Sequence, residues 1–129
     1  PLFGLNLNLK EAPRYVATEQ RPELACAFMV ILGLESLAQY PEIVRHHEAG
    51  TIPPPVMWGT CPTQFDPSQA PPGRHTAFMW EKLPYHLNGD ATNWDHEKDQ
   101  HGREMLEFWG QYGQYRSKSF KNIHPPRNL

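Results

Sequence analysis

Fourteen prolines in a chain of 129 residues set the most restrictive condition on its fold. Proline fixes φ and removes a backbone donor, so a long helix cannot run through a segment in which it recurs. The prolines concentrate at positions 53–55, 71–72 and 125–126, and they divide the chain without forming a low-complexity tract. We therefore expect one domain of short elements, for which 39% hydrophobic residues provide a modest core.

Between the prolines, strand patterns alternate with helix patterns. Positions 3, 5, 7 and 9 are apolar and alternate with Gly, Asn and Lys, which predicts a strand with one buried face. Further strands are expected over 25–34, 56–60 and 76–83, the first of them buried on both faces or, alternatively, helical. We expect a short helical turn capped by Ser36, a helix from Pro41 to Gly50, and, after a turn at 88–90, a long helix capped by Asn93 or Asp95.

This order of elements, joined by short connections, predicts the α+β class: a largely antiparallel sheet with helices packed on one face. The last helix should end near Gly113 and present an apolar face. That face consists of Met105, Leu106, Phe108, Trp109 and Tyr112. We expect a domain over 1–113 and an extended or frayed C-terminal tail over 114–129.

Composition excludes several classes of function. A net charge of -2 and a pI near 6.4 provide no basic face, so nucleic acid is not an expected partner. No apolar run approaches the ~20 residues that span a bilayer, so no transmembrane segment is expected. The two cysteines, Cys26 and Cys61, form no CxxC pair or disulfide framework, which favours the reducing cytoplasm.

Residues 65–76, with the sequence FDPSQAPPGRHT, are the most distinctive stretch. They resemble the D-P-x-x-A-P-P-G-x-H stretch of phytoene-desaturase-like FAD-dependent oxidoreductases. In that family an apolar strand and a Pro-Tyr pair follow, as residues 77–80 and 84–85 do here, and a Trp-Asp pair opens a long helix, as residues 94–95 do. Residues 5–15 resemble the strand that enters the family's substrate domain. The resemblance covers residues 2–113.

The resemblance implies a substrate-binding domain or fragment of a flavin-dependent oxidoreductase that acts on a hydrophobic substrate, with polyenes among the candidates. A complete enzyme of this kind would be an FAD-dependent dehydrogenase or desaturase. FAD is implied, but its binding motif is absent from this chain: nothing fits G-x-G-x-x-G, and Gly102, Gly110 and Gly113 fall within or at the end of a predicted helix. The implied partners are therefore a hydrophobic small molecule and a separate FAD-binding chain.

The candidate site residues follow the distinctive stretch. His75 has two open roles: a catalytic group at a pocket mouth, or a histidine that hydrogen-bonds the preceding loop, which is the commoner role. Phe78, Met79, Trp80 and Tyr85 are candidate substrate-binding residues or simply sheet core. Strand alternation puts Phe78 and Trp80 on one face and Met79 on the other. We expect the pocket between the sheet and the loop over 62–75.

The remaining candidates for chemistry are weaker. His46, His47 and Glu48 are adjacent on a helix, and Glu97 and His101 provide only two ligands, so no metal site is predicted. Cys61 is expected to be an inert thiol.

Two alternative functions stay open. The first is a flavin-free small-ligand-binding or small catalytic dimer that covers its open sheet edge. The second is a tautomerase-like enzyme that uses the Pro1 amine. A homo-oligomer is expected in any case, because a domain of a larger protein would expose apolar surface.

Overall fold

The computed structural model describes residues 1–114 and the backbone of residues 117–124. Within these residues the main sheet has the order β3-β4-β5-β1-β7, and every neighbouring pair is antiparallel. A two-stranded sheet pairs β2 with β6. The strands are β1 (Leu2–Leu9), β2 (Arg14–Tyr15), β3 (Val30–Leu32), β4 (Met57–Thr60), β5 (His75–Lys82), β6 (Gly113–Gln114) and β7 (Ser117–His124).

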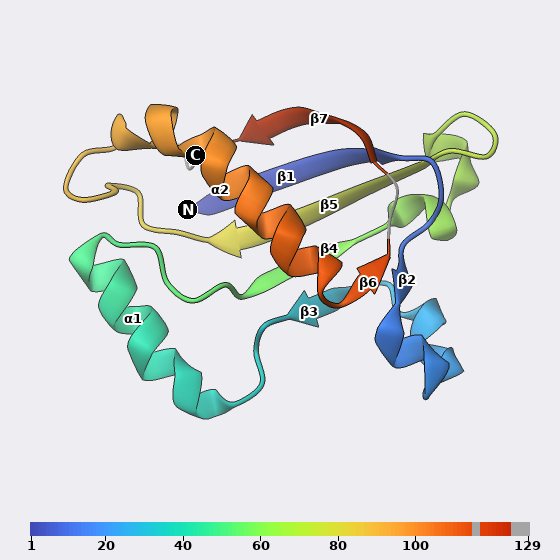
Figure 1. Ribbon diagram of the computed structural model, residues 1–129, viewed down its shortest axis with the longest axis horizontal. Coiled ribbons are helices and arrows are strands. Elements are labelled where there is room, and N and C mark those ends of the chain that lie inside the picture. Colours follow the sequence, from blue (N-terminus) through green and yellow to red (C-terminus); the bar gives the residue numbers. More distant parts are fainter. Residues whose placement is uncertain (115–116, 125–129) are drawn as a thin grey trace.

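Two α-helices accompany the sheet, and the longer one, α2, crosses in front of the strands in Figure 1. The α-helices are α1 (Tyr40–Ala49) and α2 (Asn93–Gly110). Short 3-10 helices occupy the connections: η1 (Val16–Glu19), η2 (Pro22–Cys26), η3 (Leu37–Gln39), η4 (Pro62–Gln64) and η5 (Pro67–Gln69). The predicted α+β class with a largely antiparallel sheet is confirmed.

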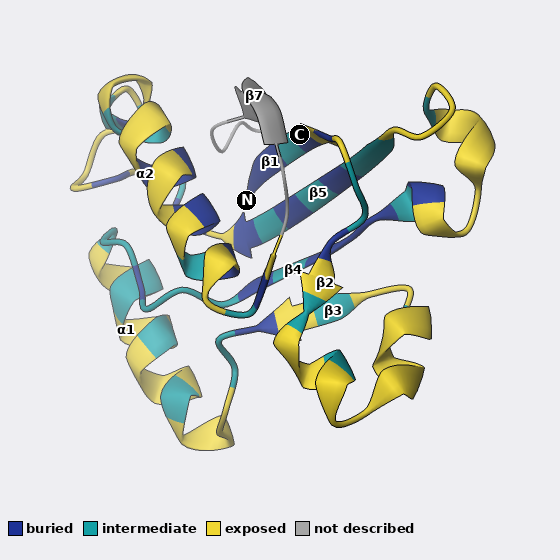
Figure 2. Cartoon of the chain, turned by 45° about the vertical axis from the view of Figure 1, so that its right-hand side comes forward, coloured by how far each residue is buried: buried dark blue, intermediate teal, exposed yellow. Residues whose placement is uncertain are grey.

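The core lies between β1, β4, β5 and the sheet-facing side of α2, where Figure 2 shows buried residues. The alternation predicted for β1 is confirmed, because its odd-numbered apolar residues are at most 3% exposed. From α2, the core takes Trp94, Met105, Leu106 and Trp109. Full burial of such side chains contributes about 1.5–3 kcal/mol each. Removal of apolar surface from water therefore holds α2 on the sheet.

The predicted helix pair around Pro41 is confirmed. Ser36 forms a capping box at η3, and Pro41 lies in the first turn of α1, where its missing N–H costs no hydrogen bond. Gly50 ends α1 with φ +70°. A Cβ at this position would lie 2.6 Å from the carbonyl oxygen of His86. Glycine is therefore required here both by the backbone conformation and by the close approach of the 86–88 loop.

The segment 25–34 departs from its predicted structure. Only Val30–Leu32 form a strand, and Ile31 is 62% exposed, so this strand is not buried on both faces. Of the residues before the strand, Ala25 and Cys26 belong to η2, which begins at Pro22, and residues 27–29 connect it to β3. The strand lies at the edge of the described sheet and pairs only with β4. Apolar composition alone does not distinguish an edge strand from a central one.

Both ends of α2 also differ from the predicted ends. The N-cap is Thr92, and the side chains of Asn93 and Asp95 do not cap the helix. Asp90 accepts the backbone N–H of Thr92 at 2.8 Å, and the Asn93 amide donates to the carbonyl of Leu87. The helix ends at Gly110, three residues before the predicted stop.

Part of the predicted tail pairs with the sheet, because β7 runs antiparallel to β1. Residues 115–116 and 125–129 of the predicted tail lie outside the described residues. The division into 1–113 and 114–129 stays a prediction.

Candidate ligand-binding face of the sheet

The alternation of β5 divides its side chains between two unlike faces. Ala77, Met79 and Glu81 are at most 3% exposed and point to the side on which α2 packs. Phe78 and Trp80 point to the other side and are half-buried. We call this second side the open face and define it by Ile31, Trp58, Phe78 and Trp80.

The open face carries a row of large side chains that crosses β3, β4 and β5. Trp58 in β4 is directly opposite Trp80 in β5, and Ile31 in β3 is opposite Trp58. On the β1 side, the residue opposite Trp80 is Gly4. Phe78 stacks on Trp80 with a centroid separation of 4.5 Å and an interplanar angle of 29°. Strand register thus places aromatic side chains of two strands at directly paired positions on one face.

A groove of about 440 Å³ adjoins this row, and we call it the α1 groove. One wall is α1 and the other is the sheet, so Ile31 and Trp58 belong to both the groove and the open face. The volume lies within the roughly 300–1,000 Å³ of small-molecule pockets. Its lining residues are mainly apolar: Ile31, Leu34, Tyr40, Ile43, Val44, His47, Pro53, Pro54, Val56, Trp58, Glu81 and Lys82.

His47 and Lys82 supply polar chemistry to the lining of the α1 groove. Burial lowers the pKa of His47, and the charge of Lys82 lowers it further, while a hydrogen bond with the Lys82 backbone opposes the shift. This lowered pKa favours the neutral form of the ring at neutral pH. A neutral imidazole beside apolar walls can orient a ligand by a hydrogen bond without imposing a charge on the groove.

His75, the predicted catalytic residue, lies on the loop side of β5 and away from the α1 groove. Its Nδ1 is 3.0 Å from the hydroxyl oxygen of Thr63, which also accepts the backbone N–H of Thr76 and lies 3.5 Å from the Cys61 sulfur. This arrangement ties the start of β5 to η4. This is the geometry expected if His75 stabilises the preceding loop by a hydrogen bond. A catalytic role for His75 stays a prediction.

The predicted substrate-binding residues do not gather at one place. Phe78 and Trp80 lie together on the open face, whereas Met79 is fully buried in the core beneath α2. A ligand on the open face cannot reach Met79, because strand alternation points its side chain to the opposite side of the sheet. Tyr85 lies beyond the end of β5, where its ring contacts His86 edge-on at 4.7 Å.

A buried ion-pair geometry beneath α2 escaped the sequence analysis. Glu81 and His101 are 1% and 4% exposed, and 2.9 Å separates a Glu81 carboxylate oxygen from His101 Nε2. Burial raises the pKa of Glu81, and the hydrogen bond to His101 opposes this rise. The sequence contained a signal, since Glu81 occupies an inward position of an alternating strand. Among the described residues, no three His, Cys, Asp or Glu side chains gather as a metal site.

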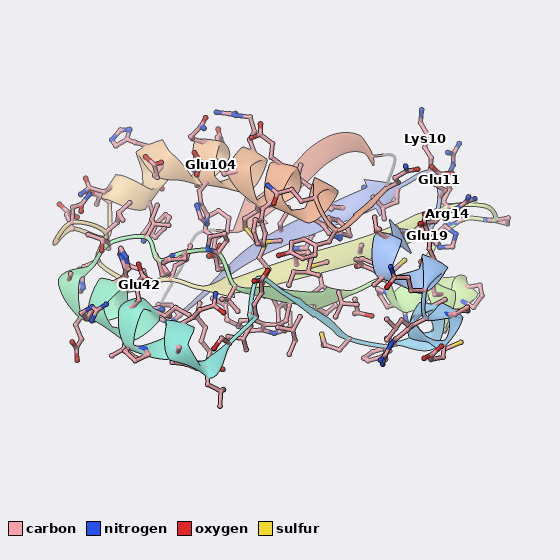
Figure 3. All side chains as sticks on the ribbon, turned by 60° about the horizontal axis from the view of Figure 1, so that its bottom comes forward. Lys10, Glu11, Arg14, Glu19, Glu42 and Glu104 are labelled. Carbon is pink, nitrogen blue, oxygen red and sulfur yellow. The ribbon has the colours of Figure 1, made fainter. Side chains whose placement is uncertain are left out.

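A group of charged side chains lies away from the open face. Figure 3 shows Lys10, Glu11, Arg14 and Glu19 together around the turn into β2, at the opposite end of the molecule from α1. Glu42 lies on α1 and Glu104 on the outer side of α2. Positive and negative groups are mixed in this cluster, which does not form the basic surface that nucleic acid requires. No helix in the described part of the chain has the length and apolar character to cross a membrane.

The fold and the open face together define a small α+β domain with an apolar, ligand-sized recess on one side of its sheet. Over 92 residues the chain is 34% identical to a limonene dehydrogenase subunit of Castellaniella defragrans. The match covers 65% of this chain and 16% of that protein, so the chain spans only a small part of the relative's length. No family model matches the chain, and no solved structure matches it.

Proposed function

We propose that this chain forms the apolar wall of the substrate site in a flavin-dependent dehydrogenase that acts on a hydrophobic substrate. The similarity to the limonene dehydrogenase subunit supports a dehydrogenase and a hydrocarbon substrate. The resemblance of residues 65–76 to phytoene-desaturase-like flavoproteins supports the flavin. A cyclic or polyene hydrocarbon has no polar handle, so its recognition depends on apolar area and ring stacking.

The open face is the observation on which this proposal rests. It places Trp58, Phe78 and Trp80 in one row beside the α1 groove, where a flat or cyclic hydrocarbon can bury its surface. In this proposal the row holds the ligand, and the α1 wall excludes water from it. The catalytic step needs no acid or base from the row.

The described residues do not fit a flavin. Binding of the FAD pyrophosphate uses a glycine-rich turn between a strand and the start of a helix. Gly102 and Gly110 instead lie within α2, and Gly113 lies in β6. The groups that hold FAD are therefore assigned to a polypeptide region outside residues 1–129, such as a separate FAD-binding chain.

Titration with limonene tests the proposed wall. We expect tryptophan fluorescence of the 129-residue chain to change saturably, and Trp58→Ala and Trp80→Ala each to raise the Kd about tenfold, which corresponds to about 1.4 kcal/mol. Leu37→Ala is the matched control, because Leu37 is 79% exposed and does not line the α1 groove. Equal affinities in all four proteins would contradict the proposal.

Flavin uptake is a separate test. We expect the purified chain to be colourless after incubation with FAD and desalting, because the described residues form no pyrophosphate-binding turn. Near-stoichiometric flavin absorbance after desalting would overturn this part of the proposal and leave the hydrocarbon site untouched.

A flavin-free ligand-binding protein is the second candidate, and it is favoured by the ligand-sized α1 groove that the residues of this chain line. The two candidates differ in what the flanking coding sequence should contain. A strand–turn–helix segment with G-x-G-x-x-G in the same transcript supports the dehydrogenase, and its absence supports the flavin-free protein.

A further inference from the structure

One edge of the main sheet, formed by the short strand β3, has neither the charge nor the proline that commonly prevents association. Among the described strands β3 pairs only with β4, so its other edge is free. Residues 28–34 read FMVILGL and contain neither a charged residue nor a proline. Natural proteins usually protect such edges with lysine, proline, a bulge or a covering segment. An unprotected apolar edge is a template for pairing with another strand.

Exposed apolar side chains gather beside this edge. A groove of about 650 Å³, which we call the β3 groove, runs between β3 and the segment that contains η1 and η2. Four of its lining residues are large, hydrophobic and at least 39% exposed, and they are Val16, Leu24, Met29 and Ile31. A cluster of this kind, in contrast to scattered single residues, is typical of an interaction site.

We propose that β3 is the interface through which two copies of this chain associate, with β3 antiparallel to its counterpart about a two-fold axis at Ile31. This pairing places Val30 opposite Leu32 of the other copy and Ile31 opposite its own equivalent. Antiparallel alternation keeps both Ile31 side chains on the same face. The aromatic rows of the two open faces then become one continuous row across a joined sheet.

The lack of charge favours a second copy as the occupant. A partner that is recognised through complementary charges finds no charged residue at 28–34. A two-fold contact is self-complementary, so apolar residues meet apolar residues from the same patch. Three paired residues are too few by themselves. A standard interface covers about 800 Å² per partner, near a tenth of the 8222 Å² that this chain exposes, so the β3 groove must also be covered.

Sedimentation equilibrium tests the proposal on the 129-residue chain without any ligand. We expect a dimer mass at tens of micromolar and a monomer mass for Ile31→Lys, because two ammonium groups would meet at the axis. Leu37→Lys is the matched control and should remain a dimer: Leu37 is the most exposed of the large hydrophobic residues and lines neither groove. Both replaced residues are mostly exposed, so we expect both variants to fold, and circular dichroism checks this.

A cross-link locates the axis. In a Cys26→Ser background, which removes the exposed free thiol, Ile31→Cys should form an intermolecular disulfide on mild oxidation, and Leu37→Cys should not. A monomer at all concentrations would overturn the proposal. So would dissociation of Leu37→Lys to the same extent as Ile31→Lys, or a disulfide that forms equally at both positions. None of these outcomes bears on hydrocarbon binding, which the titration above tests separately.

Discussion

The four tryptophans divide evenly between the two faces of the sheet, and their environments differ. Trp94 and Trp109 are at most 1% exposed beneath α2, and their indole N–H groups donate to the Pro84 carbonyl and the Tyr15 hydroxyl. Trp58 and Trp80 are half-buried on the open face. The same residue type therefore stabilises the fold where it is carried by α2 and faces the sheet, and it is available to a ligand where it is carried by β4 or β5 and points to the open face.

Replacement of one tryptophan from each face should show this difference most clearly, as unequal losses of stability. Trp109→Ala leaves a cavity in a closed core, so we expect the free energy of unfolding to fall by about 3–5 kcal/mol. Trp80→Ala should cost about 1–2 kcal/mol, because only part of its ring area is removed from water on folding. Urea denaturation of both variants measures the difference, and equal losses would contradict the division into two faces.

His75 offers a smaller effect that separates a structural role from a functional one. His75→Ala removes the hydrogen bond to Thr63, so we expect the protein to lose about 1 kcal/mol of stability and to retain its hydrocarbon affinity. His75→Asn, which can still hydrogen-bond Thr63, should recover part of the loss. A cooperative fold of unchanged stability, together with a weakened affinity per folded molecule, would instead establish His75 as part of the ligand site.

The pH dependence of stability should reveal the buried carboxyl of Glu81, which lies on the α2 side of the sheet. Burial raises the pKa of Glu81, so the folded protein holds this proton more tightly than the unfolded chain does. Stability from this group is therefore fully present below the ordinary carboxyl pKa of about 4.3 and falls as the pH rises through the raised value. Glu81→Gln should remove this decline in urea unfolding series between about pH 4 and pH 8.

Asp66 provides a control of opposite sign in the exposed loop. Hydrogen bonds from Ser68 and Gln69 lower the pKa of its carboxyl, so its contribution is present above the ordinary pKa and is lost as the pH falls through the lowered one. Asp66→Asn should therefore leave the decline above pH 4 in place. A decline that survives in Glu81→Gln would show that another group causes it.

Local sequence patterns predicted much of the α2 side of the sheet. Period-two alternation identified the buried side of β1, and three-to-four spacing identified Met105, Leu106 and Trp109 on α2, because both signals record which side of an element avoids water. Pro41 and Gly50 marked the limits of α1 for equally local reasons.

The open face could be predicted only in part. Alternation placed Phe78 and Trp80 together, but it could not pair them with Trp58 and Ile31, since register between strands is set by tertiary packing. The α1 groove requires knowledge of where the helix lies relative to the sheet. For the same reason the sequence did not predict that His101 is buried against Glu81.

Indole N–H resonances in a ¹H–¹⁵N correlation spectrum provide the most direct test of the central claim, because the chain has four tryptophans and two belong to each face. During titration with the hydrocarbon, we predict saturable shifts for Trp58 and Trp80 and unchanged positions for Trp94 and Trp109. Assignment follows from the single Trp→Phe variants. Shifts confined to Trp94 and Trp109, or no shifts at saturating ligand, would contradict the account.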